Sequence, residues 1–420
     1  MSITAWIAVL TVIVTVWALV KRYETRLVLI TAGLFLACIS LSPIQALNAF
    51  AKSMTNSGLI MAICSAMGFA FVVQMTKCDV HLVKLLSAPL SHVGFFLIPG
   101  ATIITFCICI AIPSAAGCAA AVGPTLIPLM LRAGISREGT AAAILGGTFG
   151  SMLSPGLSHN AYVAKMAGSD VMTTLGVHMP YTLTCAAIAV VGICVVCLFF
   201  KDYKKGANND QGLNLNETVD KVNLLKAIAP LIPVALLVTG NMWVPALKMG
   251  VAQAMVIGAI YTLAVTMTEP QAFTKKFFAG MGNGYGEVLG IIIAAGVFAA
   301  GLNASGLIKV FIELLKNSNE IARWGGSIGP FFMGIICGSG DAAAFAFNEA
   351  VTPHAASFGM EIQTLGTMAA LCGALGRTMS PISGVAIVIC GLTMINPMEL
   401  TKRLAIPMIV AVLYVALTMV

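Results

Sequence analysis

PSAAGCAAAVGPTLIPLMLRAGI, residues 113–135, recurs in altered form as GSGDAAAFAFNEAVTPHAASFGM, residues 338–360. The alignment places Ser114 on Ser339 and a proline of each stretch on the other. Further along, GSMLSP at 150–155 aligns with GRTMSP at 376–381. Both pairs keep nearly the same separation, and a repeat at a fixed separation indicates a duplicated structural unit. The chain therefore consists of two related halves.

The composition identifies a membrane protein. Of 420 residues, 59% are hydrophobic and only 9% are charged, and the mean hydropathy is +0.97. A soluble globule of this size needs many more ionisable groups on its surface, so soluble enzymes, nucleic-acid readers and disulfide-stapled secreted domains are excluded. The net charge of +7 is typical of cytoplasmic loops that follow the positive-inside rule, and it does not indicate a nucleic-acid partner.

Apolar segments of spanning length predict membrane helices, and two other regions predict interrupted ones. Segments long enough to cross a bilayer lie at 3–20, 26–42, 57–76, 176–200, 224–241, 248–268, 285–302 and 398–419. The regions 93–169 and 325–396 are apolar too, but Gly, Pro and Ser break them repeatedly. Such breaks are typical of re-entrant hairpins and discontinuous helices. We expect the functional site in these two regions.

The predicted fold is an all-α polytopic membrane protein with two inverted repeats, each of about five transmembrane helices with a re-entrant helical hairpin and a discontinuous helix. The predicted boundaries are a first repeat at 1–200 with its hairpin at 93–131 and its broken helix at 139–167, a cytoplasmic linker at 201–223, and a second repeat at 224–420 with its hairpin at 325–357 and its broken helix at 361–395.

An odd number of crossings per half requires the second copy to be inverted relative to the first. Placing both termini outside puts most Lys and Arg residues in the cytoplasm, among them Lys201 and Lys402, as the positive-inside rule expects. The first hairpin then enters from the cytoplasm and the second from outside.

Interrupted helices at membrane depth predict a wet cavity, because lipid cannot satisfy the backbone groups that they free. Helix N-termini that meet there offer free N–H donors and partial positive charge, so an anion is the natural ligand. The residues at the tips and breaks that we expect to bind it are Ser114, Gly117, Ser154, His159, Asn160, Ser339, Gly340, Thr378 and Ser380. For a single glycine, tight helix packing is the more common role. A packing role at a helix end also competes for His159 and Asn160.

Arg377 carries a full positive charge within one of the two interrupted regions. A charged side chain in mid-membrane costs on the order of 2.5–3.5 kcal/mol, so it normally faces a partner or a water-filled path. Its guanidinium fork matches a carboxylate, which makes Arg377 a candidate counter-charge for an organic anion. A buried structural pair with Asp341 or Glu349, both in the second hairpin, is the alternative.

Asp341 and Glu349 are also candidates for a coupling-ion site. Carboxylates together with unwound backbone carbonyls are what hard cations bind. We therefore expect Na⁺ or H⁺ as the coupling ion, with a possible Na⁺ site near Asp341, and no other cofactor.

With the repeat established, three stretches of the second half resemble one family. AAGVFAAGLNASGLIKVF at 294–311, CGSGDAAAFAFNEAVTP at 337–353 and LGRTMSPISGVAIVICGL at 375–392 look like the anaerobic four-carbon dicarboxylate uptake carriers of the Dcu type, C branch, within the ion-transporter superfamily. The resemblance runs through most of the chain. It implies a multi-pass carrier of the bacterial inner membrane that takes up or exchanges fumarate, malate, succinate or aspartate, and a homodimer with an elevator-like mobile domain.

Two short motifs depart from the family pattern. After the first break the family usually has Ser-Gly-Asp, whereas this chain has Ser158, His159 and Asn160. The second hairpin usually reads Gly-Ser-Gly-Asn, whereas this chain has Asp341. An acid has thus moved from one repeat to the other, which leaves the exact substrate and coupling ion open.

Other functions compete with dicarboxylate transport. A carrier of the same superfamily for gluconate, a monocarboxylate or an amino acid remains possible, as does a cation/proton antiporter that uses Asp341. An occluding pair of hairpins fits alternating access better than an open channel. The stretch 338–341 matches the G-x-G-D of intramembrane aspartyl proteases, but that chemistry needs a second nearby aspartate, and we find no supporting motif for an enzyme.

Overall fold

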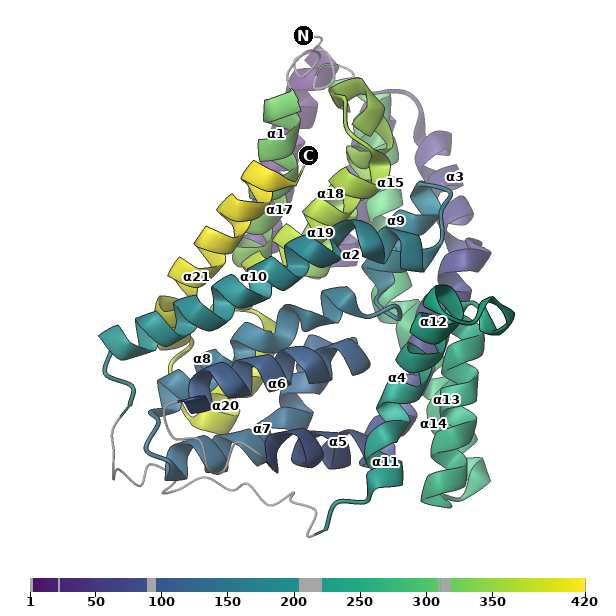
Figure 1. Cartoon of the computed structure of the whole chain (residues 1–420). Helices are drawn as coiled ribbons and strands as arrows, with labels where there is room; N and C mark the ends of the chain where they lie inside the picture. The colour runs from purple at the N-terminus through teal and green to yellow at the C-terminus, as the bar shows by residue number, and fades with distance from the viewer. Residues whose placement is uncertain are drawn as a thin grey trace.

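The computed structural model describes residues 3–21, 23–88, 96–203, 221–308, 310 and 319–419. These residues form a helical bundle (Figure 1), which confirms the predicted all-α class. In the first half the helices are α1 (Ile3–Val20), α2 (Thr25–Ile39), α3 (Pro43–Met54), α4 (Ser57–Met75), α5 (Cys78–Ser87), α6 (Leu97–Ala111), α7 (Ala115–Arg132), α8 (Arg137–Gly147), η3 (Thr148–Leu153), α9 (Ser158–Met166) and α10 (Val171–Phe199).

The second half follows a similar order. Its helices are α11 (Leu224–Ile228), η4 (Ala229–Leu231), α12 (Ile232–Met242), η5 (Pro245–Leu247), α13 (Val251–Thr266), α14 (Pro270–Asn283), the π-helical η6 (Gly284–Leu289), α15 (Gly290–Ala304), α17 (Asn319–Cys337), α18 (Gly340–Ala350), η7 (Thr352–Phe358), α19 (Ile362–Met379), α20 (Gly384–Thr393) and α21 (Pro397–Thr418). Most of the predicted linker, 204–220, lies outside the described residues, as do 93–95 of the first predicted hairpin.

Six helical stretches among the described residues are long and apolar enough to cross a bilayer. They are Ser57–Met75, Ala115–Arg132, Val171–Phe199, Pro270–Ala304, Ile362–Thr393 and Pro397–Thr418, and shorter apolar helices accompany them. The stretch Pro270–Ala304 is longer than the predicted span at 285–302, because α14 runs into α15 through η6. A π-helical turn keeps a long helix continuous while shifting its register.

The buried apolar residues divide the helices into two packed bodies. The largest core cluster joins α5–α8 and α10 to α17–α21. We call these helices the hairpin body and include α9 in it, whose buried residues Ala161, Tyr162 and Val163 pack into the neighbouring cluster at the border with α4. The other clusters lie mainly among α1–α4 and α11–α15, and we call these helices the frame body. In Figure 1, α6, α8, α10 and α20 lie to the left, and α4, α12, α13 and α14 lie to the right.

At two corresponding positions of the hairpin body, a glycine lies directly against the backbone of a neighbouring helix. A Cβ added at Gly150 would lie 2.3 Å from the Phe106 carbonyl oxygen, and a Cβ added at Gly376 would lie 2.1 Å from the Phe331 carbonyl oxygen. Glycine is therefore needed where each hairpin arm, α6 or α17, crosses the broken helix behind it. These glycines are the first residues of the aligned GSMLSP and GRTMSP stretches.

The hairpin tips and helix breaks also share backbone geometry. Ser114 (φ −130°, ψ 111°) and Ser339 (φ −127°, ψ 105°) are the N-caps of α7 and α18. Ser154 (φ −80°, ψ 127°) and Ser380 (φ −72°, ψ 126°) end the first segment of each broken helix. Extended backbone at a residue before proline stops a helix, so each break has a local cause in the sequence.

A buried ion pair joins the ends of α10 and α21. Arg403 Nε and Nη2 each donate to the Asp202 carboxylate at 2.8 Å, and Ser136 Oγ donates to the same carboxylate at 2.6 Å. Both charged side chains are almost fully buried, with 6% and 2% of their surface exposed. The Arg403 guanidinium also lies over the Phe200 ring. This cluster connects the start of α8 with α10 and α21.

Candidate functional site

A cavity of about 240 Å³ lies where the hairpin tips meet the broken helices. It is smaller than the roughly 300–1,000 Å³ of sites for drug-sized ligands, so it suits a small metabolite. Its lining residues are Ile63, Ala66, Met67, Pro113, Ser114, Ala115, Ala116, Ser151, Met152, Gly156, Leu157, Ser158, His159, Val288, Asp341, Ala374, Arg377 and Val385.

Four helix N-termini contribute to this lining. α7 begins at Ala115, α9 at Ser158, α18 at Gly340 and α20 at Gly384, and each has residues of its first turn, or next to it, on the cavity. The first backbone N–H groups of a helix lack internal partners, and the helix dipole adds partial positive charge there. The cavity is therefore suited to anionic groups, as the sequence predicts.

Arg377 brings a full positive charge to the cavity. Its Nη1 atom is buried and has no hydrogen-bond partner among the described residues. The carboxylate of Asp341 is paired with His159 instead, so the structure does not show the Arg377–Asp341 ion pair that the sequence left open. A buried N–H donor without a partner is costly, and a bound carboxylate would satisfy it.

Asp341 lies in the first turn of α18 and is held by His159 from α9. The distance between His159 Nε2 and Asp341 Oδ1 is 2.9 Å, and the His159 side chain is 3% exposed while that of Asp341 is 53% exposed. The His159 ring stacks on Phe345 with centroids 4.2 Å apart. His159 and Asp341 are two of the positions at which the sequence departs from the family pattern, and here they are in contact.

The charges of the cavity come from the second half of the chain. In the aligned stretches Ser151 takes the place of Arg377, and Ala116 takes the place of Asp341. All four residues line the cavity. The two halves thus contribute corresponding positions, but only the second half supplies ionised side chains.

Asn160 is fully used in holding the first helix break. Its Nδ2 donates to the carbonyl oxygens of Met152 at 2.8 Å and Ser154 at 2.9 Å, while its Oδ1 lies 3.0 Å from His178 Nε2. With this amide orientation His178 donates from Nε2, and its Nδ1 accepts from Thr182 Oγ1 at 3.0 Å. Asn160 is 1% exposed and does not line the cavity.

Several other predicted site residues lie beside the cavity instead of on it. Ser339 Oγ accepts from Ala342 N, Ser380 Oγ donates to the Ile335 carbonyl and Thr378 Oγ1 donates to the Ala374 carbonyl. A Cβ at Gly340 would lie 2.6 Å from the Gly373 carbonyl oxygen, and one at Gly117 would lie 2.6 Å from Gln74 Nε2. Ser154 Oγ is buried without a partner among the described atoms.

Glu349 is not close to Asp341 in the cavity. It lies farther along α18, toward the frame body, where its Oε1 would be 3.5 Å from a Cβ at Gly296 of α15. The structure therefore brings Ser114, His159, Asp341 and Arg377 together at the cavity, and it does not bring Glu349 into that group.

Sequence reasoning missed part of the cavity wall. Ser151 was detectable, because the repeat alignment places it on Arg377. Met67 of α4 and Val288 of η6 also line the cavity, and they belong to the frame body. No motif marks them, since their role follows from how the two bodies pack.

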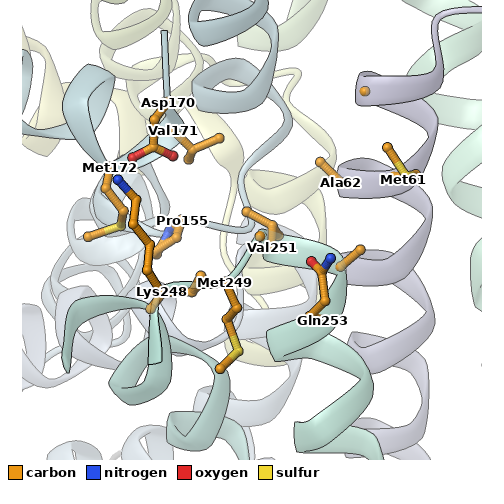
Figure 2. A pocket seen from close by; sticks show the side chains of 14 residues that line it. Met61, Ala62, Pro155, Asp170, Val171, Met172, Lys248, Met249, Val251 and Gln253 are labelled. Carbon is orange, nitrogen blue, oxygen red and sulfur yellow. The ribbon is translucent and has the colours of Figure 1, made fainter. Parts of the chain in front are cut away.

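A second cavity, of about 280 Å³, lies on the other side of the first break. Figure 2 shows Pro155 between the side chains of α4 and those at the start of α10, with Lys248 directed toward Asp170. Pro155 lines this cavity and Gly156 lines the first one. The two spaces are thus separated by the loop of the broken helix.

A helical membrane protein with interrupted helices around a charged cavity belongs to the class of membrane transporters. The chain is a member of the DcuC family, whose profile, described as C4-dicarboxylate anaerobic carrier, matches residues 3–420. This confirms the family inferred from the sequence, and the family consists of transporters and not of enzymes.

The relatives agree with this assignment. An uncharacterised Haemophilus influenzae transporter is 50% identical over 278 residues, which cover 64% of this chain and 100% of that protein. The Escherichia coli anaerobic C4-dicarboxylate transporter DcuC is 27% identical over 430 residues, covering 94% of this chain and 92% of the relative.

The fold also matches a solved structure. Neisseria gonorrhoeae MtrF, from a study of a class of antimetabolite efflux pumps, aligns with a TM-score of 0.63 and 14% identity, covering 90% of this chain and 84% of that one. At this identity the match concerns the fold alone.

Proposed function

We propose that the chain is a secondary active transporter of C4-dicarboxylates such as fumarate, succinate, malate and aspartate. The observation that carries this proposal is the Arg377 guanidinium, which lines a cavity with four helix N-termini and whose buried Nη1 atom has no partner among the described residues. Arg pairs with carboxylates through two parallel hydrogen bonds. The name of the Escherichia coli relative supports the same substrate class.

The binding mode follows from the cavity. One substrate carboxylate pairs with Arg377, while the other accepts from backbone N–H groups near Ser114 and Ser158. The Asp341 carboxylate lines the same cavity, and its Oδ2 has no hydrogen-bond partner among the described residues, so the proposed cycle includes a cation at this position. That cation is Na⁺, H⁺ or a positive group of the substrate itself. Other organic anions of similar size, a monocarboxylate or a gluconate-like acid, are the nearest alternatives.

The architecture supports alternating access. The recurring glycine contacts and the matching serine geometry fit two inverted repeats, of residues 1–200 and 224–420, joined by a linker at 201–223. We propose that the hairpin body moves against the frame body as an elevator and carries the cavity with it. The proposal includes a homodimer in the bacterial inner membrane, with the linker in the cytoplasm.

Uptake into proteoliposomes tests the substrate class. Vesicles are preloaded with unlabelled dicarboxylate or left empty, and labelled succinate and labelled L-aspartate are added with and without a sodium gradient. Uptake that requires internal dicarboxylate identifies an exchanger, and uptake that requires the gradient identifies cation coupling. Uptake of neither compound under any condition would reject the C4-dicarboxylate class.

Replacing the Arg377 guanidinium should weaken substrate binding more than it lowers the stability of the fold. We expect Arg377→Gln to lower kcat/KM for the transported dicarboxylate by about 10- to 150-fold, because a hydrogen bond between charged groups contributes roughly 1.5–3 kcal/mol. Arg323→Gln, a substitution on α17 away from the cavity lining, is the matched control. Equal loss in both variants, or unchanged uptake by Arg377→Gln, would contradict the assigned role.

A further inference from the structure

Asp341 presents an open carboxylate to a cavity that is otherwise built for anions. Its side chain is 53% exposed and lines the cavity together with Arg377. His159 Nε2 lies 2.9 Å from Oδ1, and the described part of the chain offers no hydrogen-bond partner to Oδ2. The second carboxylate oxygen is therefore available to a ligand that carries positive charge.

We propose that Asp341 binds an ammonium group carried by the substrate itself, so that the preferred ligand is an amino-dicarboxylate such as L-aspartate. The inference rests on the proposed function, because it names the substrate class of the same cavity. Asp341 then selects among four-carbon dicarboxylates, while Arg377 recognises the carboxylate that all of them share.

A metal ion fits this site less well. The described residues contain no group of three His, Cys, Asp or Glu side chains that would hold one. Hard cations prefer several oxygen ligands, about six to eight for calcium, whereas the cavity supplies one carboxylate, with the His159 ring against it and the Arg377 guanidinium on the same wall. An ammonium group needs fewer partners, since its three N–H donors can use one carboxylate and nearby carbonyls or water.

The charges of the cavity also match a zwitterionic group. An α-amino acid carries a carboxylate and an ammonium group on one carbon atom, and the cavity offers one guanidinium and one carboxylate on its wall. The charges of these two side chains cancel, so the positive charge that remains in the cavity is the partial charge of the helix N-termini. A ligand with two carboxylates and one ammonium group, of net charge −1, suits that balance better than a dianion.

His159 acts as a positioning residue for Asp341. Its ring stacks on Phe345, which also makes an edge contact with Tyr162 at 5.2 Å. His159 Nδ1 is buried without a partner among the described atoms. Because an ionised carboxylate only accepts hydrogen bonds, His159 donates from Nε2 to Asp341 Oδ1. This contact holds Oδ1 and leaves Oδ2 toward the cavity.

The test compares L-aspartate with L-malate, which differ by an ammonium group in place of a hydroxyl group on the same carbon skeleton. Inhibition constants of both compounds are measured against uptake of labelled L-aspartate and labelled succinate in proteoliposomes. We expect the unmodified protein to prefer L-aspartate by about tenfold or more, because a site built for a polar group rejects analogues that lack it. Asp341→Asn should lose this preference and keep or improve its affinity for L-malate.

Matched variants separate binding from folding. Glu361→Gln changes an acid to an amide at the N-cap of α19, away from the cavity, and should keep the preference. Asp341→Ser provides a second removal of the charge should Asp341→Asn fold poorly, and thermal unfolding in detergent reports folding for every variant.

The possible outcomes distinguish this inference from the proposed function. Equal loss of both ligands in the folded Asp341 variants overturns it, and so does a preference of the unmodified protein for L-malate. A loss of sodium dependence in Asp341→Asn with an unchanged ligand ratio assigns Asp341 to a coupling cation and overturns it as well. If the protein takes up succinate but not L-aspartate, the ammonium site alone is rejected. If it takes up neither compound, the proposed function is rejected too.

Discussion

Asn160 shows how one side chain can support a cavity without lining it. It donates to the carbonyl oxygens of Met152 and Ser154 and pairs with His178. The Met152 carbonyl lies at the end of a helix segment that has no further turn to satisfy it, and the Ser154 carbonyl accepts from Leu157 N as well, at 3.1 Å. Asn160 therefore stabilises the interruption itself, and the break holds the start of α9 at the cavity.

We expect Asn160→Ala to lower the free energy of unfolding by about 1–3 kcal/mol, the cost of leaving buried polar groups without partners. Thermal unfolding of the detergent-solubilised protein measures this. The KM should change less than in Arg377→Gln, since Asn160 does not line the cavity. Asn303→Ala, at an exposed position of α15, is the control and should leave the unfolding temperature nearly unchanged.

At the residue scale, Arg377 and Asp341 line the cavity, whereas Glu349, the third charged residue that the sequence singled out, does not. Arg377 and Asp341 were identifiable because a charged side chain at membrane depth is costly and normally faces a partner or a water-filled path. The pairing of Asp341 with His159 was not, because these residues are far apart in the chain and only the packing of α9 against α18 brings them together. Thr378 and Ser380 carry suitable hydroxyl groups, but the helix geometry directs both to backbone carbonyls.

At the scale of single elements, the hairpin arms depend on glycine. Gly150→Ala and Gly376→Ala should each destabilise the protein by about 1–3 kcal/mol, because the added methyl group would overlap a backbone carbonyl that cannot rotate away. Gly391→Ala on α20 meets nothing within 4 Å and should be neutral or slightly stabilising, since alanine favours a helix. Thermal unfolding of the three variants side by side checks the contrast.

The buried ion pair between α10 and α21 gives another prediction at this scale. Arg403→Leu leaves the Asp202 carboxylate buried without its cation, and breaking such a pair costs about 3–5 kcal/mol. We expect poor recovery from detergent and a clearly lower unfolding temperature. Lys402→Leu, which removes an exposed partner of Glu399, should have a much smaller effect, because exposed pairs contribute about 0–1 kcal/mol. Similar losses in both variants would refute the structural role of Arg403.

The sequence predicted the interrupted regions, since Gly, Ser and Pro act locally on the backbone. Element boundaries were less predictable. The arm α17 already includes Asn319, before the expected 325, and α14 joins α15 through a π-helical stretch. Neither feature has a local signal of its own, because tertiary packing decides where an apolar helix ends.

At the scale of the whole molecule, the elevator proposal requires the two bodies to slide. Gly58 of α4 faces Lys165 of α9 across their boundary, with 3.7 Å between a Cβ at Gly58 and Lys165 Cδ. In a cysteine-free background, Gly58→Cys together with Lys165→Cys and a short reducible cross-linker should stop uptake, and reduction should restore it. Each single cysteine variant treated in the same way is the control. Full uptake by the cross-linked protein would contradict relative movement of the bodies.

The uneven origin of the cavity charges has a kinetic consequence. The hairpin α6–α7 lines the cavity with Ala116 and Ser114, whereas α17–α18 lines it with Asp341. In the proposed binding mode, displacing the first hairpin would expose the ligand without breaking a contact between charged groups. Displacing the second hairpin would break such a contact, the one with Asp341. The two sides of the membrane should then differ in how fast ligand leaves and returns, even though a passive exchanger must give the same equilibrium from either side. A duplicated scaffold can in this way combine symmetric thermodynamics with unequal rates.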